Sequence, residues 1–147
     1  MTDQSNSLPF KGQCLCGSIQ YEVDQIEPKM GHCHCTMCRK FHGAAFATYA
    51  EAKIEKFRWL SGEHLLKRYL ASNGTTRQFC GTCGASMTFS PSNDLGQVIE
   101  FALGTLESDI EHRPDVHIFR DNAASWFELN DELPQYTQGR DSELVAK

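Results

Sequence analysis

Seven cysteines constrain what this 147-residue chain can fold into more than any other feature. They form three closely spaced groups: Cys14 and Cys16; Cys33, Cys35 and Cys38; Cys80 and Cys83. The start "MTDQSNSLPF" lacks the basic and apolar regions of a secretory signal, and no apolar run is long enough to span a membrane. We therefore expect a cytoplasmic protein, in which so many thiols are more typical of metal ligands than of disulfides.

The first and last cysteine groups together supply a complete set of four zinc ligands. In the extended pair Cys14–Cys16 both sulfurs point to the same face. In "FCGTCG" a tight turn brings Cys80 and Cys83 together in the same way. A redox role for this second pair would need a helix starting inside the motif, whereas the following "GASMTFSP" indicates a strand. We predict a structural zinc that joins two distant segments.

The middle group, in "CHCTMC", supplies only three thiols, from Cys33, Cys35 and Cys38. Three protein ligands and one open position are typical of catalytic zinc sites. His42 is the alternative fourth ligand, if "CRKFHG" forms a helical turn that brings it onto the face of Cys38. His32 and His34 would point away from the Cys33 sulfur in an extended chain. We favour an exchangeable ligand from outside the protein.

Short alternating segments predict a mainly β fold. In residues 11–23, Ile19, Tyr21 and Val23 would share one buried face. Further strands are predicted at 45–49 and within "HLLKRYLA", "TTRQFC", "ASMTFS", "QVIEFALGTL" and "VHIFR". No long amphipathic helix is evident, so we expect one domain with short helical turns over residues 10–137, between polar tails at 1–9 and 138–147.

The charge of the chain argues against nucleic acid as a partner. The formal net charge is −5, and seven thiolates on two Zn²⁺ ions would make it more negative still. Binding to phosphates requires clustered Lys and Arg instead.

Four stretches of the chain carry a family resemblance: "GQCLCGSIQYEV", "CHCTMCRKFHGAAF", "RQFCGTCGASM" and "RPDVHIFRDNAASWFELNDELPQY". They resemble the glutathione-dependent formaldehyde-activating enzyme family, which shares its domain with centromere protein V, from about Gly12 to Tyr136. The resemblance implies the β-rich Mss4-like fold and the same division of cysteines between a structural and a more labile zinc. It also implies a carbon–sulfur lyase that combines glutathione with formaldehyde to give S-hydroxymethylglutathione.

The implied reaction assigns roles to residues around the second zinc. A thiol bound there would be deprotonated, which makes Cys33, Cys35 and Cys38 the catalytic set. Basic residues should meet the carboxylates of glutathione, and Arg39 and Lys40 are the nearest candidates. Arg77, which precedes the third cysteine group, is a further candidate.

Other polar and aromatic residues are expected to have structural roles. We expect Phe46, Trp126 and Phe127 to lie in the core, and His117 to be a hydrogen-bonded structural residue. Two alternatives to the lyase stay open: a zinc-stabilised protein-binding module without catalysis, and a protein that stores or passes on zinc.

Overall fold

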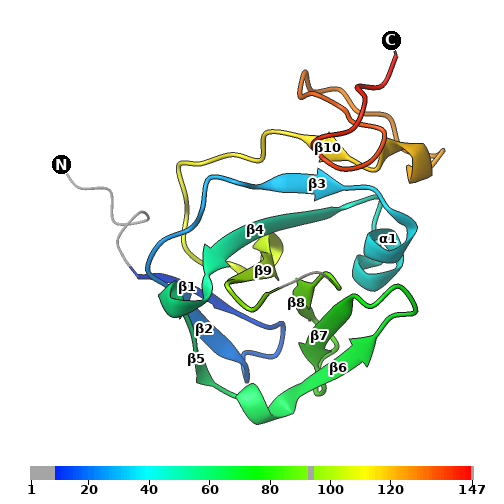
Figure 1. Ribbon diagram of the computed structural model, residues 1–147. Coiled ribbons are helices and arrows are strands. Elements are labelled where there is room, and N and C mark those ends of the chain that lie inside the picture. Colours follow the sequence, from blue (N-terminus) through cyan, green and yellow to red (C-terminus); the bar gives the residue numbers. More distant parts are fainter. Residues whose placement is uncertain (1–8, 93–94, 147) are drawn as a thin grey trace. The chain divides into compact units, whose positions relative to one another are not determined.

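The computed structural model describes residues 9–92 and 95–146 of the chain. The chain divides into two compact units, each made of two segments that are distant in sequence. Unit 1 comprises residues 1–28 and 50–112, and unit 2 comprises residues 29–49 and 113–147. Strands predominate in unit 1, and strand β4 (Ala47–Lys53) contributes residues to both units (Figure 1).

Unit 1 contains two series of antiparallel strands. The first has the order β1-β2-β5, with bounds β1 (Phe10–Gln13), β2 (Gln20–Val23) and β5 (Phe57–Ser61). The second runs from β9 through β8 and β7 to β6, with bounds β6 (Leu66–Leu70), β7 (Thr76–Cys80), β8 (Ser86–Ser90) and β9 (Val98–Ala102). Three single 3-10 turns connect strands: η2 (Ile54–Lys56), η3 (Glu63–Leu65) and η4 (Leu103–Thr105).

Residues 11–23 form a hairpin rather than one continuous strand. The chain turns between β1 and β2, where Cys14 N–H donates to Ile19 O at 3.0 Å and Gly17 N–H donates to Cys14 O at 3.1 Å. Gly17 has φ +80°, which a residue with a side chain rarely adopts. The alternation predicted for the segment holds from Ile19 to Val23 only, because the turn interrupts it before that point.

An aromatic core holds unit 1 together. The predicted buried face of Ile19, Tyr21 and Val23 is confirmed, since all three side chains are fully buried. The Tyr21 ring stacks on Phe57 at 5.0 Å and meets the edge of Phe101 at 5.6 Å. Its hydroxyl is 2.7 Å from Thr105 Oγ1, so the one polar atom of this side chain is also satisfied.

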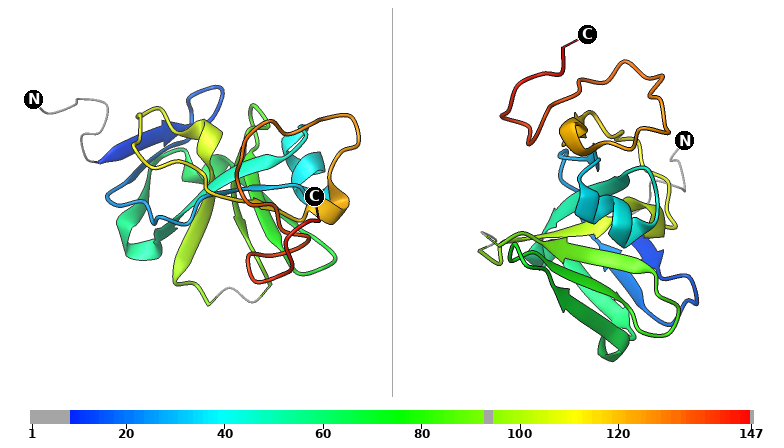
Figure 2. Two further views of the ribbon diagram at one scale, coloured as in Figure 1. Left: turned by 90° about the horizontal axis from the view of Figure 1, so that it is seen from above. Right: turned by 90° about the vertical axis from the view of Figure 1, so that its right-hand side faces the viewer.

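Unit 2 is built around the short strand β3 (Gly31–Cys33). One edge of β3 pairs in parallel with β10 (His117–Ile118), and the other pairs antiparallel with the first residues of β4. Helix α1 (Thr36–His42) follows β3, and the 3-10 turn η5 (Arg120–Asn122) follows β10. Among the described residues α1 is the only α-helix, and it is one short coil in both views of Figure 2.

Residues at the end of the chain contribute to unit 2. Thr137 N–H donates to Glu143 O and Val145 N–H donates to Gln135 O, both at 2.8 Å. The Arg140 guanidinium donates to Met30 O at 2.7 Å. The described part of the predicted polar tail, 138–146, is therefore hydrogen-bonded to the unit.

The mainly β fold predicted from the sequence is confirmed, with short helical turns between the strands. No helix in the described part of the chain is long and apolar enough to cross a membrane.

Candidate metal centres

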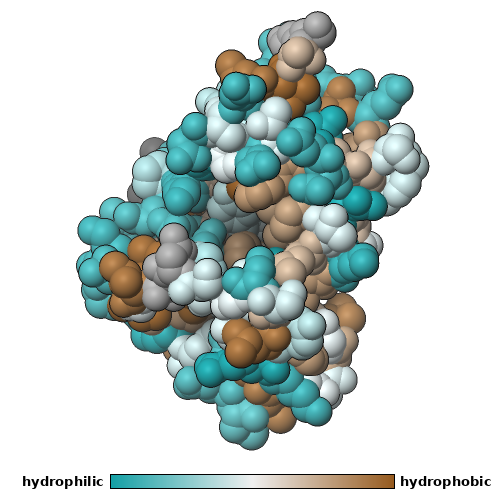
Figure 3. All heavy atoms as spheres, turned by 45° about the vertical axis from the view of Figure 1, so that its right-hand side comes forward, coloured by the Kyte–Doolittle hydropathy of each residue, from teal (hydrophilic) through white to brown (hydrophobic). Residues whose placement is uncertain are grey.

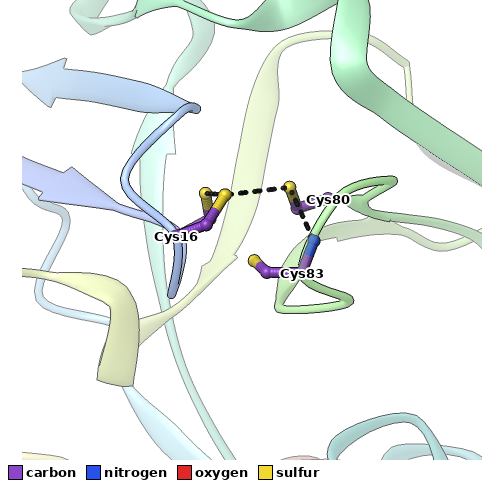
Figure 4. Close-up of side chains that lie close together, drawn as sticks. Cys16, Cys80 and Cys83 are labelled. Carbon is purple, nitrogen blue, oxygen red and sulfur yellow. Dashed lines mark hydrogen bonds between the residues drawn. The ribbon is translucent and has the colours of Figure 1, made fainter.

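Four thiols of unit 1 form the first candidate centre, which we call the closed cluster: Cys14, Cys16, Cys80 and Cys83. Their sulfur atoms lie within 4.8 Å of one another, and the side chains of Cys16, Cys80 and Cys83 point toward one another (Figure 4). The Cys14 and Cys16 sulfurs are 3.6 Å apart, and those of Cys16 and Cys80 are 3.9 Å apart. Four sulfurs about 2.3 Å from a central Zn²⁺ would be about 3.8 Å apart, so this donor set fits tetrahedral zinc.

Two turns of similar build present these thiols. Between β1 and β2, Ile19 N–H donates to Cys14 Sγ at 3.3 Å. Between β7 and β8, the N–H groups of Thr82 and Cys83 point at Cys80 Sγ at 3.3 and 3.4 Å. Backbone donors aimed at sulfur stabilise the thiolate form, which is the form that binds metal.

The pKa values of the thiols in the closed cluster are shifted in both directions. Burial, as the largest cause, raises the pKa of Cys14. The Ser18 hydroxyl lowers the pKa of Cys16. Burial works to raise the pKa of Cys83, but hydrogen bonds, with the Ala85 backbone as their largest contributor, lower it overall to about 6. Cys16 and Cys83 are thus prepared to ionise, and a cation would also stabilise Cys14 as a thiolate.

Three thiols of unit 2 form the second candidate centre, the open cluster: Cys33, Cys35 and Cys38. Cys33 ends β3, Cys35 is the N-cap residue of α1, and Cys38 lies inside that helix. The Cys35 sulfur accepts a hydrogen bond from Cys38 N–H at 3.3 Å, as a serine or aspartate oxygen does at this position. The strand end and the first helical turn thereby bring the three sulfurs within 4.8 Å of one another.

The three thiols of the open cluster cannot all ionise without a nearby cation. The neighbouring thiols of Cys35 and Cys38, followed by burial, strongly raise the pKa of Cys33. The physical cause is that several negative charges cannot share so small a volume unaided. A divalent metal ion would remove this penalty, which is why the donor set fits a zinc site with three thiolates.

No histidine belongs to either cluster among the described residues. The His42 ring lies against Phe41, with centroids 5.1 Å apart. Next to the open cluster in sequence, His34 is buried and its Nε2 is 2.8 Å from Nδ1 of the buried His117. Burial is the main cause that lowers the pKa of His34 to about 3, and that of His32 to about 4.

Sequence reasoning missed two residues that continue this histidine contact. His117 Nε2 is 2.9 Å from Asp131 Oδ2, and Arg120 Nη1 is 3.4 Å from His34 Nδ1. Partial burial raises the pKa of Asp131, but the His117 hydrogen bond and others lower it below its usual value overall. The expectation that His117 is hydrogen-bonded was correct, but its partners lie too far away in sequence for any local pattern to show them.

The three basic candidates occupy different surroundings. Arg39 is half-buried on α1, and its Nη1 donates to Asn122 O at 2.9 Å. Its Nε is buried and has no hydrogen-bond acceptor among the described residues. Lys40 is exposed. Arg77 belongs to unit 1, where its buried side chain lies over the Phe89 ring at 5.6 Å.

The expectation that the aromatic residues lie in the core was wrong for two of them. Trp126 is 68% exposed and Phe127 is 44% exposed, while Phe46 is half-buried. The segment that carries Trp126 has no strand or helix to turn the side chain inward. Exposed hydrophobic residues are also spread along the rest of the chain, and Figure 3 shows them in separate groups among hydrophilic ones on the face in view.

The structure thus combines a mainly β fold with one closed and one open cysteine cluster, each of which could hold a metal ion. Residues 9–122 match the sequence model of the family described as glutathione-dependent formaldehyde-activating enzyme. The chain belongs to this family, as its cysteine motifs predicted.

The chain is also similar to two other proteins. An uncharacterized lyase of Schizosaccharomyces pombe is 26% identical over 131 residues, which cover 83% of this chain and 93% of that protein. A crystal structure of a Rhodobacter sphaeroides protein is 25% identical and superposes with a TM-score of 0.58, covering 69% of this chain and 91% of that one. The family and the lyase relative support a lyase-type role related to glutathione and formaldehyde.

Proposed function

We propose that the protein is a zinc-dependent carbon–sulfur lyase that combines glutathione, or another small thiol, with formaldehyde or a related aldehyde. The observation that carries the proposal is the open cluster: three thiols grouped together, with no fourth protein ligand among the described residues. A purely structural zinc site would be closed by four protein ligands. Family membership and the lyase relative point to the same class of reaction.

The two clusters have different roles in this proposal. Cys14, Cys16, Cys80 and Cys83 hold a structural zinc that ties the β1–β2 turn to the β7–β8 turn. Cys33, Cys35 and Cys38 hold a more labile zinc whose fourth position is open to the substrate thiol. Zinc bound there supplies a positive charge that lowers the pKa of an incoming thiol, so that sulfur is nucleophilic at neutral pH.

The reaction is an addition without oxidation or reduction. The glutathione sulfur gives up its proton and attacks the carbonyl carbon of the aldehyde. A carbon–sulfur bond forms, the π bond of the carbonyl breaks, and the carbonyl oxygen takes up a proton to become a hydroxyl. The reverse reaction cleaves the carbon–sulfur bond, which is the lyase direction.

Arg39 and Lys40 are proposed to bind the carboxylates of glutathione. Arg39 lies one residue after Cys38 and uses one guanidinium N–H on Asn122 O. A guanidinium has five N–H donors, so others are left for a bidentate contact with a carboxylate. Lys40 would add a point charge from the exposed side of α1.

Cobalt substitution tests whether the substrate thiol enters the open cluster. The thiolate-to-cobalt charge-transfer band reports how many sulfurs are bound, so glutathione should strengthen it by about one sulfur's share. S-methylglutathione is the matched control, because it keeps both carboxylates but has no free thiol, and it should leave the band unchanged. Cys38→Ser should abolish the response.

The opposite result would point to a site closed by protein. If glutathione does not change the band, while His42→Ala does, then His42 is the fourth ligand and the lyase proposal fails.

A further inference from the structure

A chain of hydrogen bonds runs through the buried part of unit 2. It links four side chains one after another. Arg120 Nη1 is 3.4 Å from His34 Nδ1, and His34 Nε2 is 2.8 Å from His117 Nδ1. His117 Nε2 is in turn 2.9 Å from Asp131 Oδ2. Both histidines are fully buried, whereas the Asp131 side chain is 43% exposed. The chain thus leads from the protein surface to the residue between Cys33 and Cys35.

The Asp131 end fixes the direction of every proton in the chain. An ionised carboxylate only accepts hydrogen bonds, so His117 carries its proton on Nε2. Its Nδ1 is then an acceptor, and His34 must donate to it from Nε2. This leaves His34 Nδ1 without a proton, as an acceptor.

The Arg120 end requires the same direction independently. A guanidinium only donates, so the nitrogen that faces it, His34 Nδ1, has to accept. The two ends of the chain therefore agree on one pair of tautomers, with both histidines protonated on Nε2. Agreement from both ends is the mark of a network in which every donor has an acceptor.

Backbone hydrogen bonds attach the same segment to the same neighbour. His32 N–H donates to Val116 O and His34 N–H donates to Ile118 O, both at 2.9 Å. The backbone of residues 32–34 is held by residues 116–118, and the His34 side chain is held by His117 of β10. The positions of the Cys33 and Cys35 sulfurs depend on this segment, because Cys33 lies within it and Cys35 follows it.

We propose that Asp131 is a positioning residue of the open cluster: acting through His117 and His34, it holds the backbone between Cys33 and Cys35 in the conformation that binds metal. This role rests on the proposed zinc site of that cluster. Hydrogen bonds that orient metal ligands from outside the coordination sphere commonly contribute 10- to 100-fold to metal affinity. Here the orienting chain ends on a surface carboxylate 14 residues from His117.

Asp131→Asn should reverse the chain, because the other oxygen of Asp131 is already committed. Leu133 N–H donates to Asp131 Oδ1 at 3.1 Å. In the Asn variant the amide oxygen would keep this bond, so the amide N–H₂ would face His117. His117 would then accept on Nε2 and carry its proton on Nδ1, and His34 would carry its proton on Nδ1, against the N–H of Arg120. The substitution changes one heavy atom and creates a donor–donor conflict at the far end.

Long-range ¹H–¹⁵N NMR of the imidazole nitrogens tests the assigned tautomers of His34 and His117 in the full-length protein. The native protein should show His34 and His117 protonated on Nε2, and Asp131→Asn should move the His117 proton to Nδ1. Glu132→Gln is the matched control, since it removes the neighbouring carboxylate and should leave both tautomers unchanged. A native His117 protonated on Nδ1, or an Asn variant with the native pattern, would overturn the inference.

Zinc competition with a chelator tests the consequence for the metal. Asp131→Asn should weaken the second zinc equivalent by about 10- to 100-fold and leave the first unchanged, while Asp131→Glu, which restores an acceptor, should recover most of the loss. Unchanged affinity in the Asn variant would refute the positioning role. A native protein that binds only one zinc would instead refute the proposed function, and the two failures are therefore distinct.

Discussion

The closed and open clusters both consist of cysteines, but the cysteines are arranged differently along the sequence. The closed cluster gathers four thiols from two turns, and Cys16 and Cys80 are 64 residues apart in sequence. The open cluster takes three thiols from six consecutive residues at one strand–helix junction. A metal ion in the first would join distant segments of unit 1, whereas one in the second would join only neighbours. Metal loss should therefore damage the fold at the first cluster and only the site at the second.

The surroundings of the two clusters differ as well. Unit 1 contains a core of hydrocarbon rings, with Tyr21, Phe57 and Phe101 in mutual contact. The rings near the open cluster in unit 2 include three imidazoles beside Phe46: His32 stacks on His117 at 4.7 Å, and His34 lies 5.0 Å from His117. The hydrophobic effect does not depend on how the buried groups are oriented, whereas buried imidazoles need hydrogen-bond partners in specific positions. Unit 2 thus depends more on polar geometry.

The largest expected effect is that of a ligand replacement in the closed cluster. Cys80→Ser should lower the free energy of unfolding by more than about 4 kcal/mol, because losing a structural metal is among the most damaging single changes. Its matched control is Cys38→Ser, which should stay folded and lose one equivalent of zinc. Chemical denaturation and metal analysis of both variants measure the difference. Equal damage by the two would remove the distinction between the clusters.

Two glycines with positive φ allow the cost of a Gly→Ala substitution to be compared between the units, and the expected effect is smaller than that of Cys80→Ser. Gly62 (φ +75°) lies in unit 1, where a Cβ would overlap Ser18 O in the turn that carries Cys14 and Cys16. Gly43 (φ +60°) ends α1 in unit 2, and a Cβ added there would meet nothing within 4 Å among the described residues. Gly62→Ala should cost about 3 kcal/mol, from backbone strain and overlap together. Gly43→Ala should cost only the strain, about 1–2 kcal/mol.

Thermal unfolding of both alanine variants checks the prediction. Comparable losses would mean that the Ser18 turn moves aside freely, and that the closed cluster is not held rigidly by its neighbours.

Much of this architecture could be predicted from local sequence, since the signals were local. Period-2 alternation identified the buried face of β2, and cysteine spacing identified the two groups of sulfurs that the structure brings together. A helical turn in "CRKFHG" was considered only as the condition for His42 to be a ligand; α1 does form there, but His42 does not join the cluster. The strand face and each cysteine pair depend on residues within a few positions of one another, and the two pairs of the closed cluster could be matched because together they supply four thiols.

What could not be predicted depends on contacts between distant residues. Asp131 and Arg120 meet the histidines across 14 and 86 positions, so neither periodicity nor spacing indicates them. The exposure of Trp126 was missed for a related reason. A large aromatic residue is usually buried, but this expectation rests on residue type alone. It does not take into account that residues 123–130 form no strand or helix.

Removal of metal from the open cluster should have a moderate effect on stability. A mild chelator should take about one zinc equivalent while the fold persists. The free energy of unfolding should fall by about 1.4 kcal/mol if free zinc had stood about 10-fold above its dissociation constant. Denaturant titration with and without the chelator, together with zinc analysis, measures this. Complete unfolding on removal of the first equivalent would contradict the assignment of the more labile metal to the open cluster.

The smallest effect is expected at an exposed aromatic residue of unit 2. Trp126→Ala should change the free energy of unfolding by less than about 0.5 kcal/mol, because a side chain that is 68% exposed gives up little burial. The adjacent Phe127 is the matched comparison: it is 44% exposed and meets the edge of the Phe46 ring at 5.8 Å. Its replacement by Ala should cost about 1 kcal/mol, the usual contribution of an edge-to-face pair. Denaturant unfolding of the two variants separates these values. A larger loss for Trp126 than for Phe127 would show that Trp126 is covered in solution, and would restore the core position that its size alone had predicted.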